Sequence, residues 1–412
     1  MNSNAEQTAD IIHADVLVVG GGLVGGPMAC ALAEAGLTVA AVEMGDPNEA
    51  LSAGFDGRAS AVALSSRRLL EGIGIWDKVK SQAAPILDIR VSEGESRLFL
   101  HYDHREVGDE PLGHMVENRF IRRGTLERIR EIPRIQLLAP IRITKLERGP
   151  GMVDAALADG RHIRAPLVVA ADGRFSRLRE DAGIRVTQWS YRQWGIVCTV
   201  AHDRPHQNVA HERFLPSGPF AILPLPGNRS SIVWTERDDL GKATMKLNDE
   251  DFAEELATRF GDFLGETEVV GPRWSYPLSL QYAHTSVAHR LALVGDAAHA
   301  MHPIAGQGLN MGWRDVAALA EVLADSRRLG LDLGAPDVLE RYERWRRFDN
   351  TLMLAMTDAL NRLFSNDVAP LRLARDTGLA IVNRIPPLKK VFMQHAMGVV
   401  GELPKLMRGE SL

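Results

Sequence analysis

The sequence predicts an α/β fold, in which a Rossmann-like three-layer domain carries an inserted antiparallel-sheet domain and is followed by a C-terminal helical region. Three observations lead to this prediction. A β-branched segment runs into a glycine-rich turn and a helix near the N-terminus, Pro/Gly turns separate strand-like segments between residues 186 and 284, and the pattern after Met311 is helical almost to the end. With 412 residues, 45% of them hydrophobic, the chain is long enough for two cores.

The N-terminal unit is predicted to be strand, helix and strand. Val16–Val19 is a short β-branched run that is typical of a buried parallel strand. Met28–Ala35 has the pattern of a helix that ends at Gly36, and Val39–Glu43 is expected to form the next strand. Pro27 fits this helix poorly because proline has no N–H to donate, although N–H groups in a first turn are unpaired in any case.

Two later segments are expected to be buried strands of the same sheet. Leu167–Ala171 and Leu291–Val294 each precede a glycine and an aspartate, as ligand-binding strand ends of open α/β sheets often do. Between them, Gly195–Val200 and Ser230–Thr235 are typical of antiparallel strands, and Leu223–Gly227 is expected to form a turn.

These elements predict the domain organisation. The Rossmann-like domain is expected to be discontinuous, over residues 1–90, 115–185 and 285–330, and the inserted domain to cover residues 91–114 and 186–284. Residues 331–412 are expected to be helical, with breaks at Pro336, Pro370, Pro386–Pro387 and Pro404.

Composition and charge argue against several classes of protein. A net charge of −5 disfavours nucleic-acid binding, which needs a basic surface. Cys30 and Cys198 are too few for a disulfide framework and lack metal-ligand spacing, so we expect free thiols in a reducing cytoplasm and no metal. Met1–Asp10 is polar, and no run of about 18 uncharged apolar residues occurs, so any membrane contact is expected to be peripheral.

The first candidate site is the turn Gly20–Gly25, which has the G-x-G-x-x-G spacing of dinucleotide-binding folds. Gly20 permits a tight turn, Gly22 lets the backbone approach a pyrophosphate, and Gly25 lets the helix pack against the sheet. The helix N-terminus offers free N–H groups to the phosphates. Glu43, at the end of the next strand, is placed to accept hydrogen bonds from ribose hydroxyls. Because strand, helix and acid are in register, we predict dinucleotide binding rather than a ligand-free turn.

Two further motifs give the chain a resemblance to a known family. One is Ala170–Arg179, and the other is Leu293–His299, which continues through Met301–Pro303 and Gly306–Asn310. Together with the glycine turn, in this order and at these separations, they resemble the flavoprotein aromatic hydroxylases related to para-hydroxybenzoate hydroxylase. The resemblance covers nearly the whole chain, and it implies that the dinucleotide is FAD and that the Rossmann-like domain is an FAD-binding domain.

The resemblance gives the last motif a physical role. Asp296 can accept hydrogen bonds from the ribityl hydroxyls of FAD, or alternatively it can cap a helix. Gly306–Leu309 opens the helix expected over Asn310–Leu323, whose free N–H groups can stabilise negative charge on the reduced flavin. Pro303 would rigidify the turn beside the ring. Asp172 is implied to support the pyrophosphate region and the reductant, or alternatively it is a turn aspartate.

Other segments resemble the ubiquinone-biosynthesis hydroxylases within this family. Asp56–Ser65 resembles a segment whose arginine, here Arg58, lies against the cofactor, and Met115–Arg119 suggests Arg119 as a second contact. Gly218–Pro226 resembles the substrate-domain segment that faces the flavin, or alternatively it is an edge-strand turn. The predicted cofactor-binding residues are Gly20, Gly22, Leu23, Val24, Gly25, Glu43, Arg58, Arg119, Asp172, Gly295, Asp296, Pro303, Gly306, Gly308, Leu309 and Asn310.

The implied activity is hydroxylation of an aromatic ring by O2 through a flavin C4a-hydroperoxide, with NAD(P)H as a transient reductant or with a separate reductase. The cofactor then performs the difficult step, while the protein binds, orients and excludes water. We assign no catalytic base. His302 and Pro303 are candidates for the active-site wall, and His299 or His302 for proton transfer. His299 and His302 lack a third ligand, so a metal site is not expected.

The implied substrate is a polyprenyl-phenol intermediate of ubiquinone biosynthesis. From Arg341 to Leu412 the chain carries 12 Lys and Arg against 7 Asp and Glu, together with apolar residues such as Leu352 and Phe392. Such a tail can lie on a membrane or join a biosynthetic complex, or alternatively it packs as a helical cap on its own domain. We therefore expect a cytoplasmic protein with peripheral membrane contact.

Three alternatives stay open on the sequence alone. One is a hydroxylase of a soluble aromatic acid with the same fold. Another is a flavoprotein without oxygenase chemistry, such as a reductase or a halogenase, although the W-x-W-x-I-P signature of flavin halogenases does not occur. The third is a flavin-binding scaffold without catalytic activity.

Overall fold

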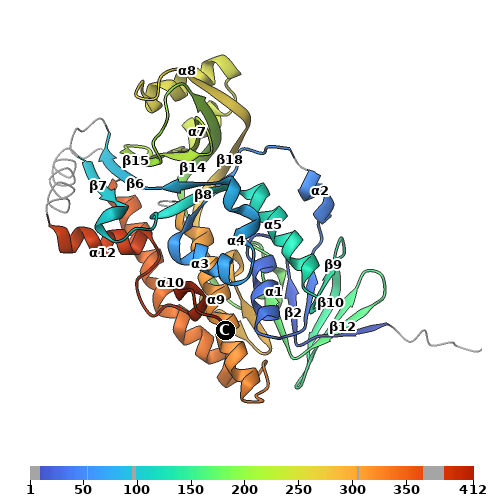
Figure 1. Ribbon diagram of the computed structural model, residues 1–412. Helices are drawn as coiled ribbons and strands as arrows, with labels where there is room; N and C mark the ends of the chain where they lie inside the picture. The colour runs from blue at the N-terminus through green and yellow to red at the C-terminus, as the bar shows by residue number, and fades with distance from the viewer. Residues whose placement is uncertain (1–9, 53, 95–98, 304–305, 365–384) are drawn as a thin grey trace, which may run out of the picture.

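The structure is a computed structural model that describes residues 10–52, 54–94, 99–303, 306–364 and 385–412. A six-stranded sheet lies between helices on one face and a small sheet on the other, and a larger sheet lies beside it (Figure 1). The long helix α10 (Pro336–Phe364) contacts both the six-stranded and the larger sheet. The predicted break at Pro370 lies outside the described residues.

The six-stranded sheet is the central layer. Its strands, in spatial order, are β19 (Val287–Ala288), β20 (Leu291–Leu293), β13 (Leu167–Ala170), β2 (Val16–Val19), β3 (Val39–Val42) and β9 (Ile135–Leu138). Every neighbouring pair is parallel except β19 and β20. Because strand side chains alternate, Val16 and Val18 pack against the helices while Leu17 packs against the small sheet. Burial on both faces accounts for the continuous apolar runs of these strands.

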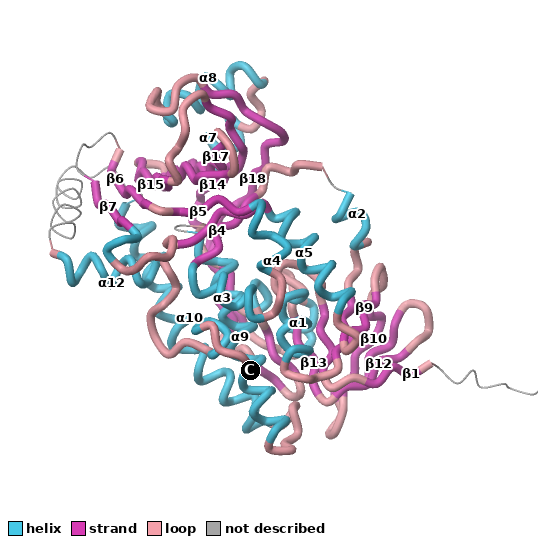
Figure 2. Tube along the Cα trace, in the orientation of Figure 1, coloured by secondary structure: helices cyan, strands magenta, loops and turns pink. Residues whose placement is uncertain are grey.

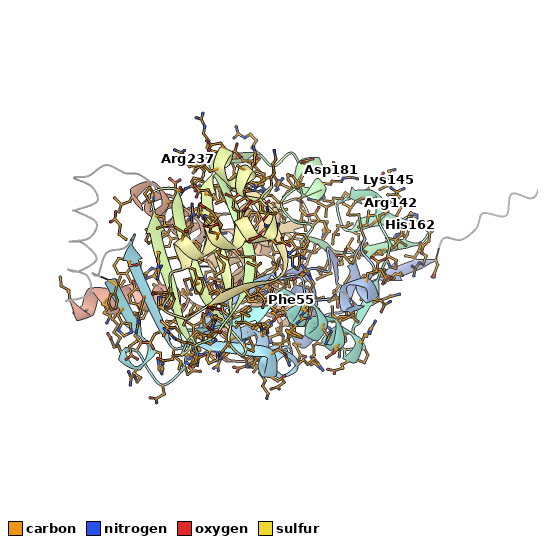
Figure 3. All side chains as sticks on the ribbon, turned by 90° about the horizontal axis from the view of Figure 1, so that it is seen from above. Phe55, Arg142, Lys145, His162, Asp181 and Arg237 are labelled. Carbon is orange, nitrogen blue, oxygen red and sulfur yellow. The ribbon has the colours of Figure 1, made fainter. Side chains whose placement is uncertain are left out.

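Helices and a small sheet complete the three layers. The helical face is formed by α1 (Gly25–Glu34), α5 (Asn118–Glu131) and α9 (Gln307–Arg328). The small sheet consists of β1 (Ile11–His13), β12 (His162–Ala165), β11 (Val153–Leu157) and β10 (Ile143–Arg148). Figure 3 shows Lys145 and His162 of this sheet at one end of the molecule, away from Arg237 of the larger sheet. The α/β fold class predicted from the sequence is confirmed.

The larger sheet has eight strands. In spatial order they are β21 (His299–Ala300), β18 (Thr267–Ala283), β14 (Val186–His202), β17 (Arg229–Arg237), β16 (Gly218–Leu225), β15 (Val209–Leu215), β6 (Asp88–Glu93) and β7 (Phe99–Asp103). Its outer face is covered by α7 (Asp238–Thr244) and α8 (Asp249–Phe260) (Figure 2). Phe252 and Phe260 of α8 pack there with Trp234. The face opposite these two helices is the inner face of the sheet.

Shorter elements connect these parts. A three-stranded sheet consists of β4 (Ala59–Ala63), β8 (Gly113–Glu117) and β5 (Ala83–Ile86). The remaining helices are α2 (Pro47–Ser52), α3 (Leu64–Gly72), α4 (Trp76–Val79), α6 (Arg177–Asp181), α12 (Pro386–Ala396) and α13 (Lys405–Arg408), and the 3-10 turns are η1 (Lys80–Gln82), η2 (His104–Glu106) and η3 (Gly295–Ala297). Strands β6 and β7, from residues 88–103, add to the eight-stranded sheet, while β8 does not. The domain boundaries given above stay a prediction.

The expected turn at Leu223–Gly227 is wrong in its first part, because β16 continues to Leu225 in the interior of the sheet. Proline is tolerated in β16 because each proline is paired on one side only. Pro219 pairs with Phe214 of β15, and Pro224 pairs with Ser230 of β17. Proline has no N–H to donate, and at each of these two positions the unpaired neighbouring strand does not require one. The interior position of β16 rules out the alternative of an edge-strand turn.

Two helices begin earlier than predicted. Helix α1 begins at Gly25, so Pro27 lies in the first turn, where a missing N–H costs no helical hydrogen bond. Helix α9 begins at Gln307 rather than Asn310. Pro336 and Pro386 start helices, as proline's fixed φ favours. Among the described helices, none combines the length and apolar composition that crossing a bilayer requires.

Candidate functional site

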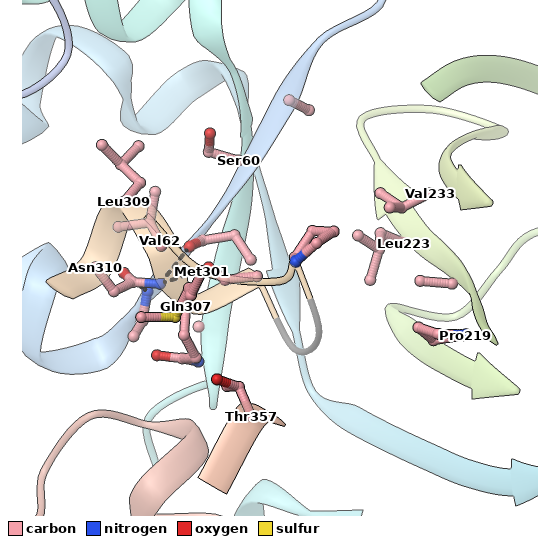
Figure 4. A pocket seen from close by; sticks show the side chains of 18 of the residues that line it. Ser60, Val62, Pro219, Leu223, Val233, Met301, Gln307, Leu309, Asn310 and Thr357 are labelled. Atoms are coloured by element: carbon pink, nitrogen blue, oxygen red, sulfur yellow. Dashed lines mark hydrogen bonds between the residues drawn. The ribbon is translucent and has the colours of Figure 1, made fainter. Parts of the chain in front are cut away.

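A cavity of about 1340 Å³ opens between the glycine turn after β2 and the inner face of the eight-stranded sheet. Ordinary ligand pockets have roughly 300–1,000 Å³, so this cavity has room for a large ligand and a second molecule. Figure 4 shows Leu309, at the start of α9, on one side and Leu223 and Val233 of the eight-stranded sheet on the other.

The glycine turn is shaped by two close backbone approaches. Gly20 has φ of 101°, and a Cβ there would lie 2.3 Å from the Ala171 carbonyl oxygen. A Cβ on Gly25 would lie 1.8 Å from the Gly20 carbonyl oxygen. Gly22 differs, because it lines the cavity and a Cβ there would meet no atom within 4 Å. The turn therefore presents open backbone to the cavity, as a pyrophosphate would need.

Glu43 stabilises this turn from behind. Its Oε2 accepts a hydrogen bond of 2.6 Å from the Gly21 N–H, and its Oε1 accepts one of 2.8 Å from the Gly45 N–H. Glu43 is not among the residues that line the cavity. Its predicted role toward a ribose therefore stays a prediction, while the structure shows it holding the backbone of the turn.

Asp296 reaches the cavity from η3, directly after β20. Its side chain is exposed, and this exposure is toward the cavity. Partial burial by the surrounding protein raises the pKa of this carboxyl, against the opposing charges of His299 and Arg174. Gly295 lies behind it, and its N–H donates to Asp315 at 3.0 Å. Asp296 is thus a carboxylate presented to a ligand from a rigid turn.

The start of α9 forms the facing wall. Gly306, Gly308, Leu309 and Asn310 all line the cavity, as does Pro303. The N–H groups of a first helical turn lack helical partners, so they can bind electron-rich ring atoms or anions there.

The Asn310 side chain is already used within the protein. Its Oδ1 accepts from the Ala63 N–H at 2.9 Å, and its Nδ2 donates to the Ala61 carbonyl at 2.8 Å. Three residues on, Trp313 Nε1 donates to the Leu23 carbonyl at 2.7 Å. Helix α9 thereby fixes both β4 and the glycine turn, and any contact of Asn310 with a cofactor would come from its backbone.

The structure separates the two predicted arginines. Arg58 lines the cavity, pairs with Asp56 at 2.7 Å and lies over the Trp274 ring at 4.6 Å from its centroid. Arg119 does not line the cavity, and its Nε donates to Glu117 at 2.7 Å. A different arginine of α5, one helical turn further along, lines the cavity with Arg58.

This arginine is Arg122, which was not predicted from the sequence. It lines the cavity together with Asn118, and it lies 3.7 Å from Asp56. Burial lowers the pKa of its guanidinium, and Arg58 contributes to this shift. Helical spacing could have indicated Arg122, because a residue four positions after Asn118 lies on the same face of the helix.

Asp172 and His302 lie behind the wall rather than on it. Asp172 accepts from the Leu178 N–H at 3.4 Å, and its Oδ1 is buried without a hydrogen-bond partner among the described residues. His302 is fully buried, its ring nitrogens have no hydrogen-bond partner in the described part of the chain, and burial lowers its pKa to about 4. It makes an edge contact with Tyr191 at 5.1 Å. His302 is therefore neutral at ordinary pH.

The cavity lining is suited to a large organic cofactor. Across the described residues, no group of three His, Cys, Asp or Glu side chains is placed to hold a metal ion. Open backbone at Gly22, the carboxylate of Asp296 and the free N–H groups of α9 fit the pyrophosphate, the ribityl chain and the ring of FAD in turn.

Known proteins are similar to this chain in sequence and in fold. The FAD binding domain family matches residues 13–354. Ubiquinone hydroxylase UbiL from Rhodospirillum rubrum is 57% identical, over 97% of this chain and 94% of that protein. The 3-demethoxyubiquinol 3-hydroxylase of Escherichia coli is 34% identical, over 93% and 98%. The crystal structure of p-nitrophenol 4-monooxygenase PnpA from Pseudomonas putida DLL-E4 has a TM-score of 0.78 at 20% identity, covering 94% and 98% of the two chains, a likeness of fold.

The glycine turn gives a paired prediction. Gly22→Ala adds a methyl group to open space at the phosphate wall, so we expect an unchanged melting temperature and at least about tenfold weaker FAD binding, or about 1.4 kcal/mol. Gly25→Ala pushes against the Gly20 carbonyl, so we expect about 1–3 kcal/mol or more of lost stability. Thermal melts and FAD titration of the apoprotein measure both. Equal melting temperatures for the two variants would contradict the assignment.

Asp296 gives a second prediction. Asp296→Ala removes a charged hydrogen-bond acceptor worth about 1.5–3 kcal/mol, so we expect a folded protein that loses most of its FAD on gel filtration. Flavin absorbance per chain measures the occupancy. Asp181→Ala, at an exposed carboxylate of α6, is the control and should retain FAD. Full occupancy in Asp296→Ala would refute the proposed role.

Proposed function

Since this chain belongs to the FAD binding domain family, among the ubiquinone-biosynthesis hydroxylases, we propose that it hydroxylates the aromatic ring of a polyprenyl-phenol intermediate of that pathway. The family resemblance and the FAD cofactor predicted from the sequence are confirmed. The protein is an FAD-dependent aromatic hydroxylase, and its substrate and O2 are the reactants.

The class of substrate is indicated by the half of the cavity that lies away from the glycine turn and the start of α9, called the substrate half below. Beyond the cofactor wall, the lining comes from β6, β7, β15, β16 and α12. Its apolar side chains include Ile89, Val91, Leu100, Leu223 and Phe392. An isoprenoid chain would be bound there by burial of apolar surface, which is worth about 25 cal/mol per Å².

The charged side chains of the substrate half argue against the alternative substrate, a soluble aromatic acid. A carboxylate ligand is usually bound by Arg or Lys. Among the described residues of this half, none is Arg or Lys, because Arg58, Arg122 and Arg174 belong to the cofactor half. The compartment instead carries the carboxylate of Glu212, which would repel an acid. A phenol with an apolar tail fits the compartment better.

Bound FAD supplies the electrons and activates O2, and the residues of this chain bind, orient and exclude water. The electron donor in our proposal is NAD(P)H, bound transiently, or a separate reductase. The apolar compartment orients the phenol ring against the start of α9, where the N–H groups and Asp296 hold the cofactor.

A direct assay tests this function. The FAD-loaded protein, supplied with a chemical or enzymatic reductant, ¹⁸O2 and a short-chain prenylated phenol, should produce a ring-hydroxylated phenol that contains one ¹⁸O atom. We expect 4-hydroxybenzoate to give at least about tenfold less product, because the compartment has no cation for its carboxylate. Mass spectrometry measures both products. Preferred hydroxylation of the acid would contradict the proposed substrate class.

Membrane contact is proposed through α12, which lies between the cavity and the outer surface. Phe392 and His395 line the cavity, whereas Ile385 and Val391 are 43% and 46% exposed. Apolar side chains of this kind bind the interface of a bilayer, where an isoprenoid substrate is dissolved. Met393 is buried in a core cluster, so deletion of the whole segment would disturb the fold.

Point substitutions test this contact without that disturbance. The double variant Ile385→Glu and Val391→Glu should keep its melting temperature and co-sediment with phospholipid vesicles at least about tenfold less, since each apolar side chain contributes up to about 1.5–3 kcal/mol. Leu240→Glu, at a residue of α7 that is 43% exposed, is the control. Unchanged vesicle binding by the double variant would refute contact through α12.

A further inference from the structure

Glu212 lies on the cavity side of β15. Side chains alternate along a strand, and the aromatic and cationic groups of its two neighbours contact Phe263 on the other face, although His211 also borders the cavity. His211 contacts the Phe263 ring at 4.9 Å between centroids, and the Arg213 guanidinium lies 5.4 Å from that centroid, on the side that α8 covers. Glu212 therefore points inward, and it lines the substrate half of the cavity.

Its surroundings on that face are apolar. Ala210 and Phe214 precede and follow it on the same face of β15. Across the sheet it is paired with Ala221 of β16 and Val91 of β6. The described residues offer its carboxylate no ion pair and no hydrogen bond. Burial alone raises the pKa of this carboxyl from 4.5 to about 7. A lone carboxylate in an apolar wall has no structural role to account for it.

The other titratable groups near this face do not replace it. His211 of β15 also borders the cavity, but burial lowers its pKa to about 4, and burial raises the pKa of Tyr276 of β18 above its usual value. From β6, Glu93 shares the face beyond Phe214, but it does not line the cavity. From β7 comes Tyr102, whose pKa burial raises above its usual value. From α12 comes His395, whose Nδ1 is bonded to the Val391 carbonyl at 2.9 Å. β16, β17 and α10 contribute uncharged side chains to this half of the cavity.

Glu212 lies across the cavity from the start of α9, and this position suggests its role. The strand pair β15 and β16 faces the start of α9, as Pro219 and Leu309 show in Figure 4. A substrate ring held between these walls meets the cofactor on one side and Glu212 on the other. We propose that Glu212 is a catalytic base that accepts the proton of the substrate's ring hydroxyl. This inference rests on the proposed function, because it requires a phenol.

The proton transfer is balanced without any oxidant or reductant. The phenol O–H bond breaks, an O–H bond forms on the Glu212 carboxylate, and the electron pair stays on the phenolate oxygen. The phenolate then donates electron density to the ring carbons ortho and para to it, which favours attack by electrophilic oxygen. A base works best when its pKa is near the working pH. An ordinary phenol has a pKa of about 10, so a carboxyl at about 7 is a far better acceptor than an exposed one.

Glu212→Gln tests the proposal, because it keeps the shape of the side chain and removes the base. Single-turnover hydroxylation of a prenylated phenol by the reduced, FAD-loaded enzyme would be followed from pH 5 to 10. The wild-type rate should rise with pH through an ionisation near 7, since the ionised carboxylate is the active form. In Glu212→Gln we expect a rate about 10²–10⁴-fold lower and the loss of that ionisation. Glu212→Asp should retain it.

A second substrate separates proton transfer from binding. A prenylated phenol with a nitro group is already ionised at pH 8, so the ratio of wild-type to Glu212→Gln rate should fall toward one. Glu268→Gln, at an exposed residue of β18, is the matched control and should keep the wild-type profile. Flavin absorbance and melting temperature check that each variant is folded and loaded, and Glu212→Ala repeats the test with a smaller side chain.

The outcomes distinguish the two proposals. If the wild type makes no hydroxylated phenol, the proposed function and this inference fail together. If the wild type is active and Glu212→Gln keeps its rate and its ionisation near 7, only the inference fails. A lower rate that the nitro-substituted phenol does not restore also overturns it, because Glu212 would then act in binding or packing.

Discussion

Asp315 lies fully buried on α9, and its carboxylate joins three separate elements of the cofactor half. It accepts from the Gly295 N–H at 3.0 Å, from His299 Nε2 at 2.7 Å and from Arg346 Nε at 2.8 Å. Burial opposes its ionisation, but the charges and hydrogen bonds of His299 and Arg346 outweigh burial and lower its pKa. Loss of one partner from a buried pair typically costs about 3–5 kcal/mol, so this junction strongly constrains the turn before Asp296.

The same helix holds the rest of the cofactor wall. Asn310 binds the backbone of β4 through both ends of its amide, and Trp313 binds the glycine turn at Leu23. Together with Asp315, these side chains fix one strand and two turns that come from distant parts of the chain. The cavity therefore presents N–H groups and a carboxylate whose geometry is set before any ligand arrives, which reduces the entropy cost of binding.

Several of the predicted residues line this half of the cavity because they lie in short, contiguous motifs. A strand, a glycine turn and a helix imply one local geometry, so the cavity position of Gly22, Leu23 and Val24 followed from spacing alone. Side-chain direction was predicted less well. Glu43 bonds to the turn, and Arg122 rather than Arg119 reaches the cavity, because helix rotation decides which of two nearby arginines points inward.

The substrate half was not predicted in detail, because no single segment builds it. Strand β15 is paired with β6, which comes more than a hundred residues earlier, and only that pairing places Glu212 beside Val91. An acid flanked by His211 and Arg213 is typical of a solvated strand. The contacts of those neighbours with Phe263 and the place of Glu212 in the cavity lining show that Glu212 faces inward. The cofactor half of the cavity is determined by backbone geometry. The substrate half is determined by which face of each strand is turned toward the cavity. Substitutions on that inner face can therefore alter the substrate half of the cavity while the opposite wall, held by Asp315 and Asn310, stays intact.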